Sequence, residues 1–475
     1  MEPDKPDAIT QAEFAASLRH VEVKITMLND MLKRMMEQTI TMSQAFLHRS
    51  KEDAVRLAVL ESSRVVHLLT RASQFYPKTR TVVFVGRGSF SDNVKYAYLS
   101  FCATAREKNV RCIFLPFDDA QHEMLTAAGL PSISPQTSTW SKEDVQTLLG
   151  ASAVVLCDNF HPHSTLSPVH YGLLQGAKSI QLWHGIPLKE IGLQHIFSPG
   201  GQNILLSDLL GSCGFFDVLV GPAAAAESEW RRWFAFREYA AIGNPRNDIF
   251  FREASAHDLL NVDMASLHAV QDARRNNRAV IIYGPTFRDH TGPDWFEKSG
   301  IVPVAAQCRA EGHEFLINLH PFEQAVVKDL RVLYPGLKFV DANTDVYPIV
   351  KHASVFITDY SSLAFDVLHA DCPLVFYRPD HADYMARARA LVPGREGYTP
   401  GDVVTDPSGL TRAIASAVEA ARHPEKDAFR KARHDLRKKL FDHHDGLAGQ
   451  RLGDVILRQI ETVEREQIAM GRTIS

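Results

Sequence analysis

Cysteine is scarce in this chain: 475 residues contain six cysteines, widely spaced and without a C-x-x-C pair. A chain of this length buries enough apolar surface to fold without covalent cross-links. The pattern therefore predicts reduced, mostly buried thiols, typical of a cytosolic protein, and argues against a disulfide framework. The six positions are Cys102, Cys112, Cys157, Cys213, Cys308 and Cys372.

Long apolar runs and an excess of charge are also missing. No uninterrupted apolar run approaches the roughly 20 residues that span a bilayer, and the acidic start MEPDKPDAIT lacks the apolar segment of a signal peptide. The formal net charge is only -4 at pH 7, and no basic run or RNA-binding aromatic motif occurs. We expect no nucleic-acid partner, no membrane span and no secretion. The expected location is cytoplasmic, with peripheral attachment at the inner face of the membrane left open.

Motifs for common cofactors are absent as well. The sequence contains no GxGxxG, no Walker loop and no G-x-S-x-G elbow. His161 with His163, and His443 with His444, lie close in sequence but lack both the i, i+4 spacing and the carboxylates of a metal site. We expect neither a cofactor nor a metal ion, so that Arg, Lys, His and helix dipoles would have to stabilise any phosphate charge.

The chain exceeds the roughly 250–300 residues at which a single hydrophobic core stops growing, so two main domains are expected. Before them, residues 1–76 form a predicted helical module. Apolar residues from Leu18 to Phe46 recur at alternating spacings of three and four, broken only at Thr39. Residues 11–75 then form either a coiled coil or hairpin for self-association or docking on a membrane-bound partner, or a helical layer on the main body.

Short apolar runs alternate with helical segments after this module, and a Gly/Pro-rich turn, AIGNPRNDIF, separates two such sets. The alternation predicts parallel sheets with right-handed crossovers. We expect an α/β fold in which two Rossmann-like domains, residues 77–250 and 251–445, face each other across a cleft, followed by a helix within 446–475. The expected strands are Thr81–Val85, Arg111–Leu115, Ala153–Leu156, Ser179–Trp183 and Val218–Val220, then a run from Ala279, Glu314–Leu319, Lys338–Val340, Ser354–Ile357 and Leu374–Tyr377.

The most informative junction is Tyr360-Ser361-Ser362, which follows an apolar run and opens a helical one in the stretch ITDYSSLAFD. Backbone N–H groups, the positive end of the helix dipole and two hydroxyls suit an anion there, above all a phosphate. Capping of the helix is the commoner use of serine at such a position, and for this motif taken alone it is the favoured alternative.

Three further segments share one design: SIQLWHGIPLKEIG, AVIIYGPTFRD and EFLINLHP each end an apolar run in His, Thr or Arg beside Gly or Pro. In an open α/β sheet the ligand crevice lies outside the carboxyl ends of the strands. The side chains that would project there are His184, Thr286, Arg288 and His320. Together the four junctions predict one site.

The two histidines are the candidates for proton chemistry. A neutral imidazole at His184 can accept a proton from an attacking hydroxyl, with Gly185 keeping its surroundings open and Lys189 adding a cation to the same turn. His320 is placed to donate a hydrogen bond to a phosphoryl oxygen or a leaving group. Each histidine has a structural alternative. His184 can simply bond to a neighbouring carbonyl in such a position, and His320 can form an ordinary His-Pro turn.

Arg246 in GNPRND and Arg288 in PTFRD are forked donors suited to bidentate phosphate contact. The alternative for each is a local ion pair, with Asp248 and Asp289 respectively.

Carboxylates near the proposed phosphate site need a different explanation, because negative charge repels the ligand. We assign Asp359 a structural role first, in which it caps or orients its loop. For Asp366, one helical turn further on, the same choice between a structural role and ligand contact stays open. Near the first expected strand, Asp92 or Asn93 can cap the helix that follows.

Taken together, WHGIPLKEIG, GNPRND, GPTFR, LHP, ITDYSSLAFD and the closing HHDG resemble, in order and spacing, the CDP-glycerol glycerophosphotransferase family. This family includes wall teichoic acid polymerases and primases and related capsule enzymes, and the resemblance runs from about Gly86 to Arg451. It implies a GT-B fold with the nucleotide donor in the C-terminal half and the acceptor in the N-terminal half. It also implies metal-independent transfer of an alditol phosphate, with glycerol phosphate as the first expectation, from a CDP-alditol to a hydroxyl of a cell-surface polymer or its lipid-linked precursor, releasing CMP.

Carried over by position, the resemblance gives His184 as the base and His320 as a second essential histidine. Ile186 stands where Thr is common and Phe287 where Trp is common, and both changes bear on substrate choice. The residues up to Phe75 match no part of the family. For binding of the donor diphosphate, the family resemblance implies Arg246, Thr286, Arg288, Ser361 and Ser362.

Two rival functions stay open at this point. One is a GT-B glycosyltransferase or epimerase that uses a UDP-sugar, and the other is an inactive family member that acts as a scaffold through its N-terminal helices. Ligand-induced thermal stabilisation by CDP-alditols or by UDP-sugars separates the first rival. Loss of all transfer, with binding of a partner through residues 11–75 retained, would favour the second.

Overall fold

The computed structural model describes residues 63–158, 167–197, 214–287, 294–320, 323–387 and 390–471. Contacts divide the chain into Met1–Arg64 and Val65–Ser475, and the fold described here is that of the second unit. Most of the predicted N-terminal helical module lies outside the described residues. From residue 63 the chain is helical up to residue 75.

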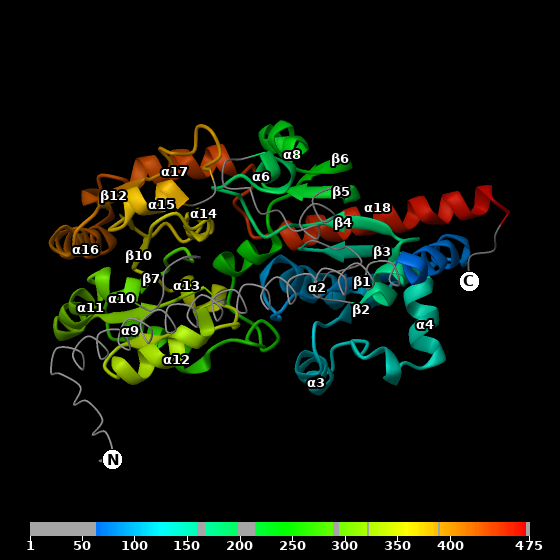
Figure 1. Ribbon diagram of the computed structural model, residues 1–475, viewed down its shortest axis with the longest axis horizontal. Helices are drawn as coiled ribbons and strands as arrows, with labels where there is room; N and C mark the ends of the chain where they lie inside the picture. Colours follow the sequence, from blue (N-terminus) through cyan, green and yellow to red (C-terminus); the bar gives the residue numbers. More distant parts are fainter. Residues whose placement is uncertain are drawn as a thin grey trace, which may run out of the picture. The chain divides into compact units, whose positions relative to one another are not determined.

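The first half of this unit forms a six-stranded, wholly parallel sheet in the order β2-β1-β3-β4-β5-β6, which we call the first sheet. Figure 1 shows it beside helix α18. Its elements are β1 (Thr79–Val85), α2 (Asp92–Ala105), β2 (Arg111–Leu115), α3 (Asp119–Ala127), η1 (Thr137–Thr139), α4 (Lys142–Leu149), β3 (Ala151–Leu156), α5 (Pro168–Leu174), β4 (Lys178–Gln181), α6 (Gly192–Phe197), β5 (Phe215–Gly221), η2 (Ala224–Ala226), α8 (Glu227–Trp233), β6 (Ala235–Ala241) and η3 (Pro245–Phe251).

The second half forms another parallel sheet, in the order β12-β11-β10-β7-β8-β9, which we call the second sheet. Its elements are α9 (Met264–Arg275), β7 (Val280–Tyr283), α10 (Asp294–Lys298), α11 (Ile301–Ala310), β8 (Glu314–Ile317), α12 (Gln324–Leu333), β9 (Lys338–Phe339), α13 (Tyr347–Val350), β10 (Val355–Thr358), α14 (Leu363–Val367), β11 (Leu374–Tyr377), α15 (His381–Arg387), β12 (Gly401–Val404), α16 (Pro407–Arg422), η5 (Pro424–Lys426), α17 (Arg430–Leu440) and α18 (Ala448–Ala469).

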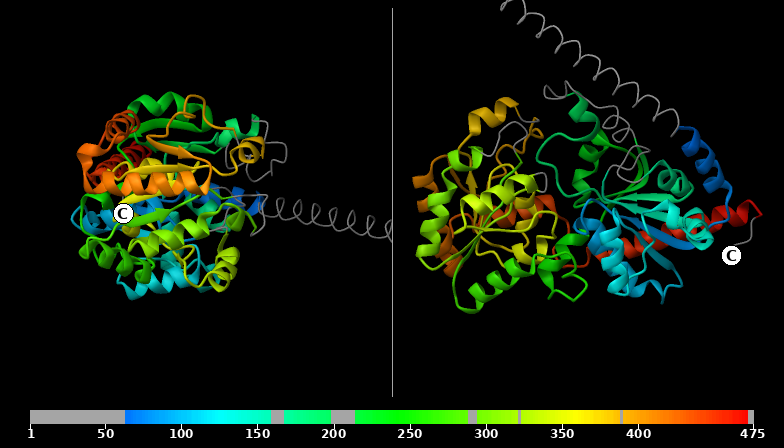
Figure 2. Two further views of the ribbon diagram at one scale, coloured as in Figure 1. Left: turned by 90° about the vertical axis from the view of Figure 1, so that its left-hand side faces the viewer. Right: turned by 60° about the horizontal axis from the view of Figure 1, so that its bottom comes forward.

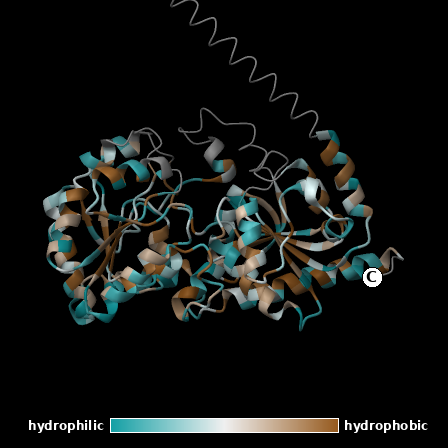
Figure 3. Ribbon diagram, turned by 90° about the horizontal axis from the view of Figure 1, so that it is seen from below, coloured by the Kyte–Doolittle hydropathy of each residue, from teal (hydrophilic) through white to brown (hydrophobic). Residues whose placement is uncertain are grey.

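Most central strands of both sheets are predominantly hydrophobic, because helices cover both faces of a parallel sheet. Every residue of β3, β7, β8, β10 and β11 is buried, and Figure 3 shows the strands coloured as hydrophobic within each sheet. The two-domain α/β prediction is therefore confirmed, and the predicted strands Arg111–Leu115 and Leu374–Tyr377 match β2 and β11 residue for residue.

Two edge strands, β6 and β12, were not predicted from the sequence. β6 reads AFREYAA, with Arg237 and Glu238 in its centre, and alternates between buried and exposed positions. β12 is likewise only partly buried. Edge strands tolerate charge and exposure because one side of the strand faces solvent, so they lack the apolar run that marks a central strand.

The last helix, α18, returns to the first sheet rather than extending the second. Its residues Leu452, Val455, Ile456 and Ile460 belong to the same core as α2, β1 and β3, and Figures 1 and 2 show it alongside the first sheet. The predicted C-terminal helix therefore completes the first domain. No described helix is both long enough and apolar enough to cross a membrane.

Candidate active site

The loop after β4 holds His184 between two residues with left-handed backbone. Trp183 has φ 52° and Gly185 has φ 105°, and a bulky residue such as Trp adopts positive φ only when the surroundings fix it. Here the Trp183 amide donates to Gln181 Oε1 at 2.9 Å, and Asn93 Nδ2 donates to the Trp183 carbonyl at 2.9 Å. The backbone around His184 is thus fixed by contacts on both sides.

The imidazole of His184 is held as a neutral ring. It stacks on Trp183 at 4.3 Å between ring centroids, and its Nδ1 lies 3.4 Å from the Cys157 carbonyl oxygen. Burial, followed by the charge of Arg87, lowers the pKa of His184 to about 4. Since a carbonyl only accepts, Nδ1 carries the proton and Nε2 keeps a lone pair, which is the form a general base requires.

Three charged side chains, Arg87, Asp92 and Asp158, lie at the topological switch point of the first sheet. This is the position at which β2 and β3 flank β1 on opposite sides. Arg87 follows β1 and contacts Asp92 Oδ2 at 2.6 Å and Asp158 Oδ2, at the end of β3, at 3.2 Å. Burial raises the pKa of Asp92, but Arg246 and then Arg87 outweigh it and bring that pKa to about 2. Asp92 is therefore ionised beside the His184 loop.

Arg246 is enclosed between two carboxylates. Its Nη1 lies 2.5 Å from Asp92 Oδ1 and its Nη2 lies 2.7 Å from Asp366 Oδ2, a carboxylate that also accepts from the Tyr347 hydroxyl at 3.1 Å. Arg246 and Asp366 are 3% and 2% exposed. A Cβ added to Gly185 would lie 2.1 Å from Arg246 Nη2, so this glycine is required for the close approach.

This geometry changes the role expected for four predicted residues. Direct contact of Arg246 with a donor phosphate does not fit a guanidinium that is buried and already paired, and its partners are distant in sequence rather than the neighbouring Asp248. Asp366 belongs to the same buried bridge. Asp92 and Asn93, expected to cap α2, instead contact Arg246 and the His184 loop, and the N-cap position falls on Ser91.

The switch point of the second sheet lies between β7 and β10, which are adjacent although β8 and β9 come between them in sequence. Thr286, after β7, donates to Asp359 Oδ1 from its amide at 2.8 Å and from its hydroxyl at 2.7 Å. Asp359 is 1% exposed. The structural role first assigned to Asp359 fits this position, because it ties the two loops at the switch point together.

Ser361 and Ser362 precede α14 and are separated from Asp359 by Tyr360. Both are partly exposed, and the hydroxyl of the N-cap residue Ser362 makes no capping hydrogen bond. The Ser361 hydroxyl accepts from the Leu363 amide at 3.4 Å, a long contact. Helix capping, the alternative raised by the sequence, is therefore not the use of the Ser362 hydroxyl in this structure.

His320 lies at the carboxyl end of β8, the strand next to β7. Its amide donates to Glu323 Oε2 at 3.1 Å, and its exposed ring lies 5.6 Å from the ring of Phe287, the residue after Thr286. His320 and Thr286 thus share one edge of the second sheet.

Two sets of contacts connect the His184 loop to the second sheet. Gly185 packs against Arg246, which pairs with Asp366 on α14. Lys189 Nζ lies 5.0 Å from the centre of the Tyr384 ring, and that ring stacks on Tyr360 at 4.1 Å.

Main-chain bonds add to this connection. The Glu190 amide donates to the Ala390 carbonyl at 2.8 Å, and the Val392 amide donates to the Leu188 carbonyl at 3.0 Å. The loops carrying His184 and Ser361 are therefore linked through Arg246 and Tyr384, whereas Arg288 lies outside the described residues.

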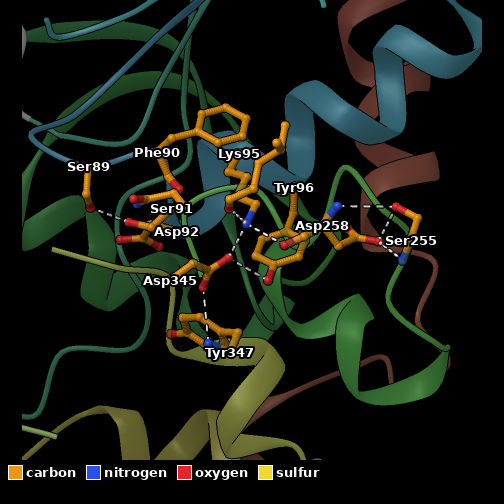
Figure 4. Close-up of polar contacts among 12 residues, drawn as sticks. Ser89, Phe90, Ser91, Asp92, Lys95, Tyr96, Ser255, Asp258, Asp345 and Tyr347 are labelled. Carbon is orange, nitrogen blue, oxygen red and sulfur yellow. Dashed lines mark hydrogen bonds and ion pairs between the residues drawn. The ribbon is translucent and has the colours of Figure 1, made fainter. Parts of the chain in front are cut away.

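A second buried ion pair joins the two halves behind this site (Figure 4). Lys95 on α2 contacts Asp345 Oδ2 at 2.7 Å and donates to the carbonyls of Asp258 and Leu260 at 2.6 and 2.8 Å. The Tyr96 hydroxyl donates to the same carboxylate oxygen at 2.7 Å. Both side chains of the ion pair are fully buried, so charges from the two halves satisfy each other without solvent.

Sequence reasoning missed the residues that support the site, above all Arg87, Asp92 as an ion-pair partner, and Tyr347. The available signal was the segment GRGSFSDN, in which Arg and Asp flank a strand-to-helix turn. Their partners lie up to 154 positions away in the chain, as with Asp92 and Arg246. Among the described residues, no group of three or more His, Cys, Asp or Glu side chains could hold a metal ion.

Two parallel six-stranded sheets, each with its switch point beside the other, define a GT-B-like protein. The wall teichoic acid polymerase TagF has the same fold: its solved structure superposes with a TM-score of 0.59 at 20% sequence identity, covering 86% of this chain and 96% of that one. The variant of TagF soaked with CDPG for 15 minutes gives a TM-score of 0.56.

The chain belongs to the CDP-Glycerol:Poly(glycerophosphate) glycerophosphotransferase family, whose model matches residues 68–458. The teichoic acid ribitol-phosphate polymerase TarK of Staphylococcus aureus is 25% identical over 345 residues, which are 71% of this chain and 62% of that relative. The teichoic acid glycerol-phosphate transferase of the same species is 25% identical over 289 residues, 59% of this chain and 71% of the relative. The chain spans about six-tenths of the length of the first relatives that it matches.

Proposed function

We propose that this protein transfers an alditol phosphate, glycerol phosphate first, from a CDP-alditol to a hydroxyl of a cell-surface polymer or its lipid-linked precursor, releasing CMP. The observation that carries the proposal is a neutral, partly buried His184 on a loop that is linked to the serine-bearing start of α14. The link runs through Arg246, which packs against Gly185 and pairs with Asp366. Family membership supports the same reaction class.

In the proposed step the acceptor oxygen attacks the distal phosphorus of the donor. Its proton moves to Nε2 of His184, and the bond between that phosphorus and the bridging oxygen breaks, so the electron pair leaves with CMP. Ser361, Ser362 and the amide groups at the start of α14 stabilise the phosphoryl charge, with His320 donating a hydrogen bond from the neighbouring strand end.

The low pKa of His184 fits this order of events. In the free protein, burial and Arg87 keep the imidazole neutral. A bound diphosphate brings negative charge into the same region and stabilises the imidazolium. The donor therefore raises the basicity of His184 when the base is needed.

The remaining predicted residues take supporting roles in this proposal. Lys189 and Arg288 supply positive charge to the diphosphate, and Thr286 holds its loop through Asp359. Gly185, Arg246 and Asp366 position the His184 loop instead of contacting the ligand.

Partners and location follow from the reaction. The donor is CDP-glycerol or another CDP-alditol, and the acceptor is a hydroxyl on a polysaccharide or a lipid-linked precursor, so we propose a cytoplasmic protein that works at the inner face of the membrane. We also propose that residues 11–75 mediate self-association or docking on a membrane-bound complex. The reaction is proposed to proceed without a metal ion.

The test is CMP release from CDP-glycerol and CDP-ribitol by His184→Gln, with a lipid-linked saccharide as acceptor. Loss of a general base typically lowers the rate 10²–10⁴-fold, and we expect about that loss with unchanged thermal unfolding. His268→Gln is the matched control, since His268 is exposed on α9. Near-normal CMP release by His184→Gln would exclude the assigned base, and wild-type protein inactive with every CDP-alditol would favour the scaffold alternative.

A further inference from the structure

Gln181, the last residue of β4, lies fully buried at the strand end that leads into the His184 loop. Directly after it, the Leu182 amide still donates to the Leu156 carbonyl of β3 at 2.7 Å. Trp183 then leaves the strand with φ 52°, and its amide donates to Gln181 Oε1 at 2.9 Å. A buried backbone donor that leaves a strand needs such an acceptor, so the Gln181 side chain supports the turn into His184.

The other end of the same side-chain amide reaches the segment after β3. Gln181 Nε2 donates to the Asp158 carbonyl at 3.0 Å. The preceding carbonyl, that of Cys157, is the one that lies 3.4 Å from Nδ1 of His184. A single amide therefore connects the backbone that carries the imidazole with the backbone that receives its Nδ1 proton. Only a group that both accepts and donates can serve these two partners.

We infer that Gln181 is a positioning residue for the His184 base. Its side-chain amide holds the ends of β3 and β4 together, so that Nδ1 of the imidazole points to the Cys157 carbonyl and Nε2 is left for the acceptor hydroxyl. This role rests on the proposed function, in which Nε2 takes the proton of that hydroxyl. Because Gln181 is fully buried, it acts through His184 and not on the substrate.

Asn93 supports the same turn from α2 but serves different atoms. Its Nδ2 donates to the Trp183 carbonyl at 2.9 Å, and its Oδ1 accepts from the Arg246 amide at 3.3 Å. These bonds hold the carbonyl side of Trp183, whereas Gln181 holds its amide and the end of β3. Loss of the Gln181 amide should therefore displace the imidazole locally while Trp183 stays attached to α2.

The charges around the imidazole do not change when Gln181 is replaced by Met. The charged groups that act on His184 come from other elements, namely Arg87 after β1, Asp92 on α2, Asp158 after β3 and Arg246 in η3. Burial is the largest cause of the lowered pKa of His184, which is about 4. A ring that moves into solvent should regain an ordinary pKa of about 6.5. In this variant the pKa of His184 thus reports where the ring lies.

The first experiment measures CMP release from CDP-glycerol by Gln181→Met, with a lipid-linked saccharide as acceptor. We expect kcat to fall about 10- to 100-fold, because a base displaced by about 1 Å loses its alignment. The KM for CDP-glycerol should stay within about 2-fold, since the serines proposed to bind the donor lie on the second sheet. Gln459→Met is the matched control and should keep the wild-type kcat, because Gln459 is a buried glutamine on α18.

The second experiment does not depend on the transfer reaction. Diethyl pyrocarbonate modifies neutral imidazoles, and mass spectrometry of the peptide that contains His184 gives the rate at this residue. In the wild-type protein the rates at pH 5.5 and pH 7.5 should agree within about 2-fold, whereas in Gln181→Met the rate at pH 5.5 should be about 10-fold lower than at pH 7.5.

A wild-type kcat in Gln181→Met would overturn the inference, and so would a rate of His184 modification that stays independent of pH in this variant. Wild-type protein that releases no CMP from any CDP-alditol would instead refute the proposed function, and the modification rates would still decide how the imidazole is held.

If Gln181→Met does not fold, Gln181→Glu takes its place, because a protonated carboxyl group supplies both an acceptor and a donor. The ratio of its kcat to that of the wild type should rise from pH 7.5 to pH 5.5. A ratio that does not rise would count against the role of the amide.

Discussion

The buried pair of Lys95 and Asp345 gives the sharpest prediction about stability (Figure 4). In Lys95→Met the ammonium is lost and the volume is nearly kept. Asp345 then stays fully buried with the Tyr96 hydroxyl and the Tyr347 amide as its remaining donors. The carbonyls of Asp258 and Leu260 lose their donor as well.

The magnitude follows from what is left behind. Removing one partner of a buried ion pair costs about 3–5 kcal/mol, because the other charge stays in a medium that solvates it poorly. Replacing both partners by apolar groups of similar volume is often close to neutral. We therefore expect Lys95→Met to lose about 3–5 kcal/mol of unfolding free energy and the double variant Lys95→Met, Asp345→Leu to regain most of it.

The assay is urea unfolding followed by both tryptophan fluorescence and far-UV circular dichroism, since coincident transitions justify a two-state free energy. The control is Lys431→Met, because Lys431 pairs with Asp435 at 2.6 Å on the exposed surface of α17 and such pairs contribute little. A loss below about 1 kcal/mol for Lys95→Met, or a double variant less stable than the single one, would refute the reasoning.

Three further predictions concern the site and the pH dependence. Gly185→Ala places a methyl group 2.1 Å from Arg246 Nη2 at φ 105°, so CMP release should fall at least about 10-fold, and steady-state kinetics that match the wild type would contradict this. Because the pKa of His184 is lowered to about 4, kcat/KM at pH 5.5 should stay within about 2-fold of its value at pH 7.5, whereas an unperturbed imidazole would give a loss of about 10-fold. Burial lowers the pKa of His369 to about 3, so the unfolded chain binds a proton below about pH 6.5 that the folded protein does not, and stability falls as the pH decreases. His369→Phe should remove about 2 kcal/mol of the stability difference between pH 7 and pH 5, measured by urea unfolding at both values, and an unchanged difference would disprove the assignment.

Much of the fold could be read from the sequence because central parallel strands leave a clear pattern. A strand buried on both faces is predominantly apolar, as β10 and β11 are. The edge strands β6 and β12 have no such constraint and were missed. The boundaries proposed for the domains and the role of residues 11–75 stay predictions.

The site residues also divide into those that a local sequence pattern reveals and those that it does not. His184, Thr286, His320 and the Ser361 junction were predicted because a polar residue that ends an apolar run beside Gly or Pro marks the carboxyl end of a strand. Arg246 shows the opposite case: the local partner that the sequence offered was Asp248, and the fold pairs Arg246 with other carboxylates. Its carboxylates come from α2 and α14, and no local pattern encodes that pairing.

By itself, the sequence determined which segments are strands, which of their ends carry polar groups, and which family the motifs resemble, since these depend on neighbours a few residues apart. The tertiary structure alone decided how the charges are paired. It buried Lys95 against Asp345 and Arg246 between Asp92 and Asp366, and it returned α18 to the first sheet. The pairing has a large effect because these charges are buried. A charge removed from water is stabilised only by the partners that the fold supplies.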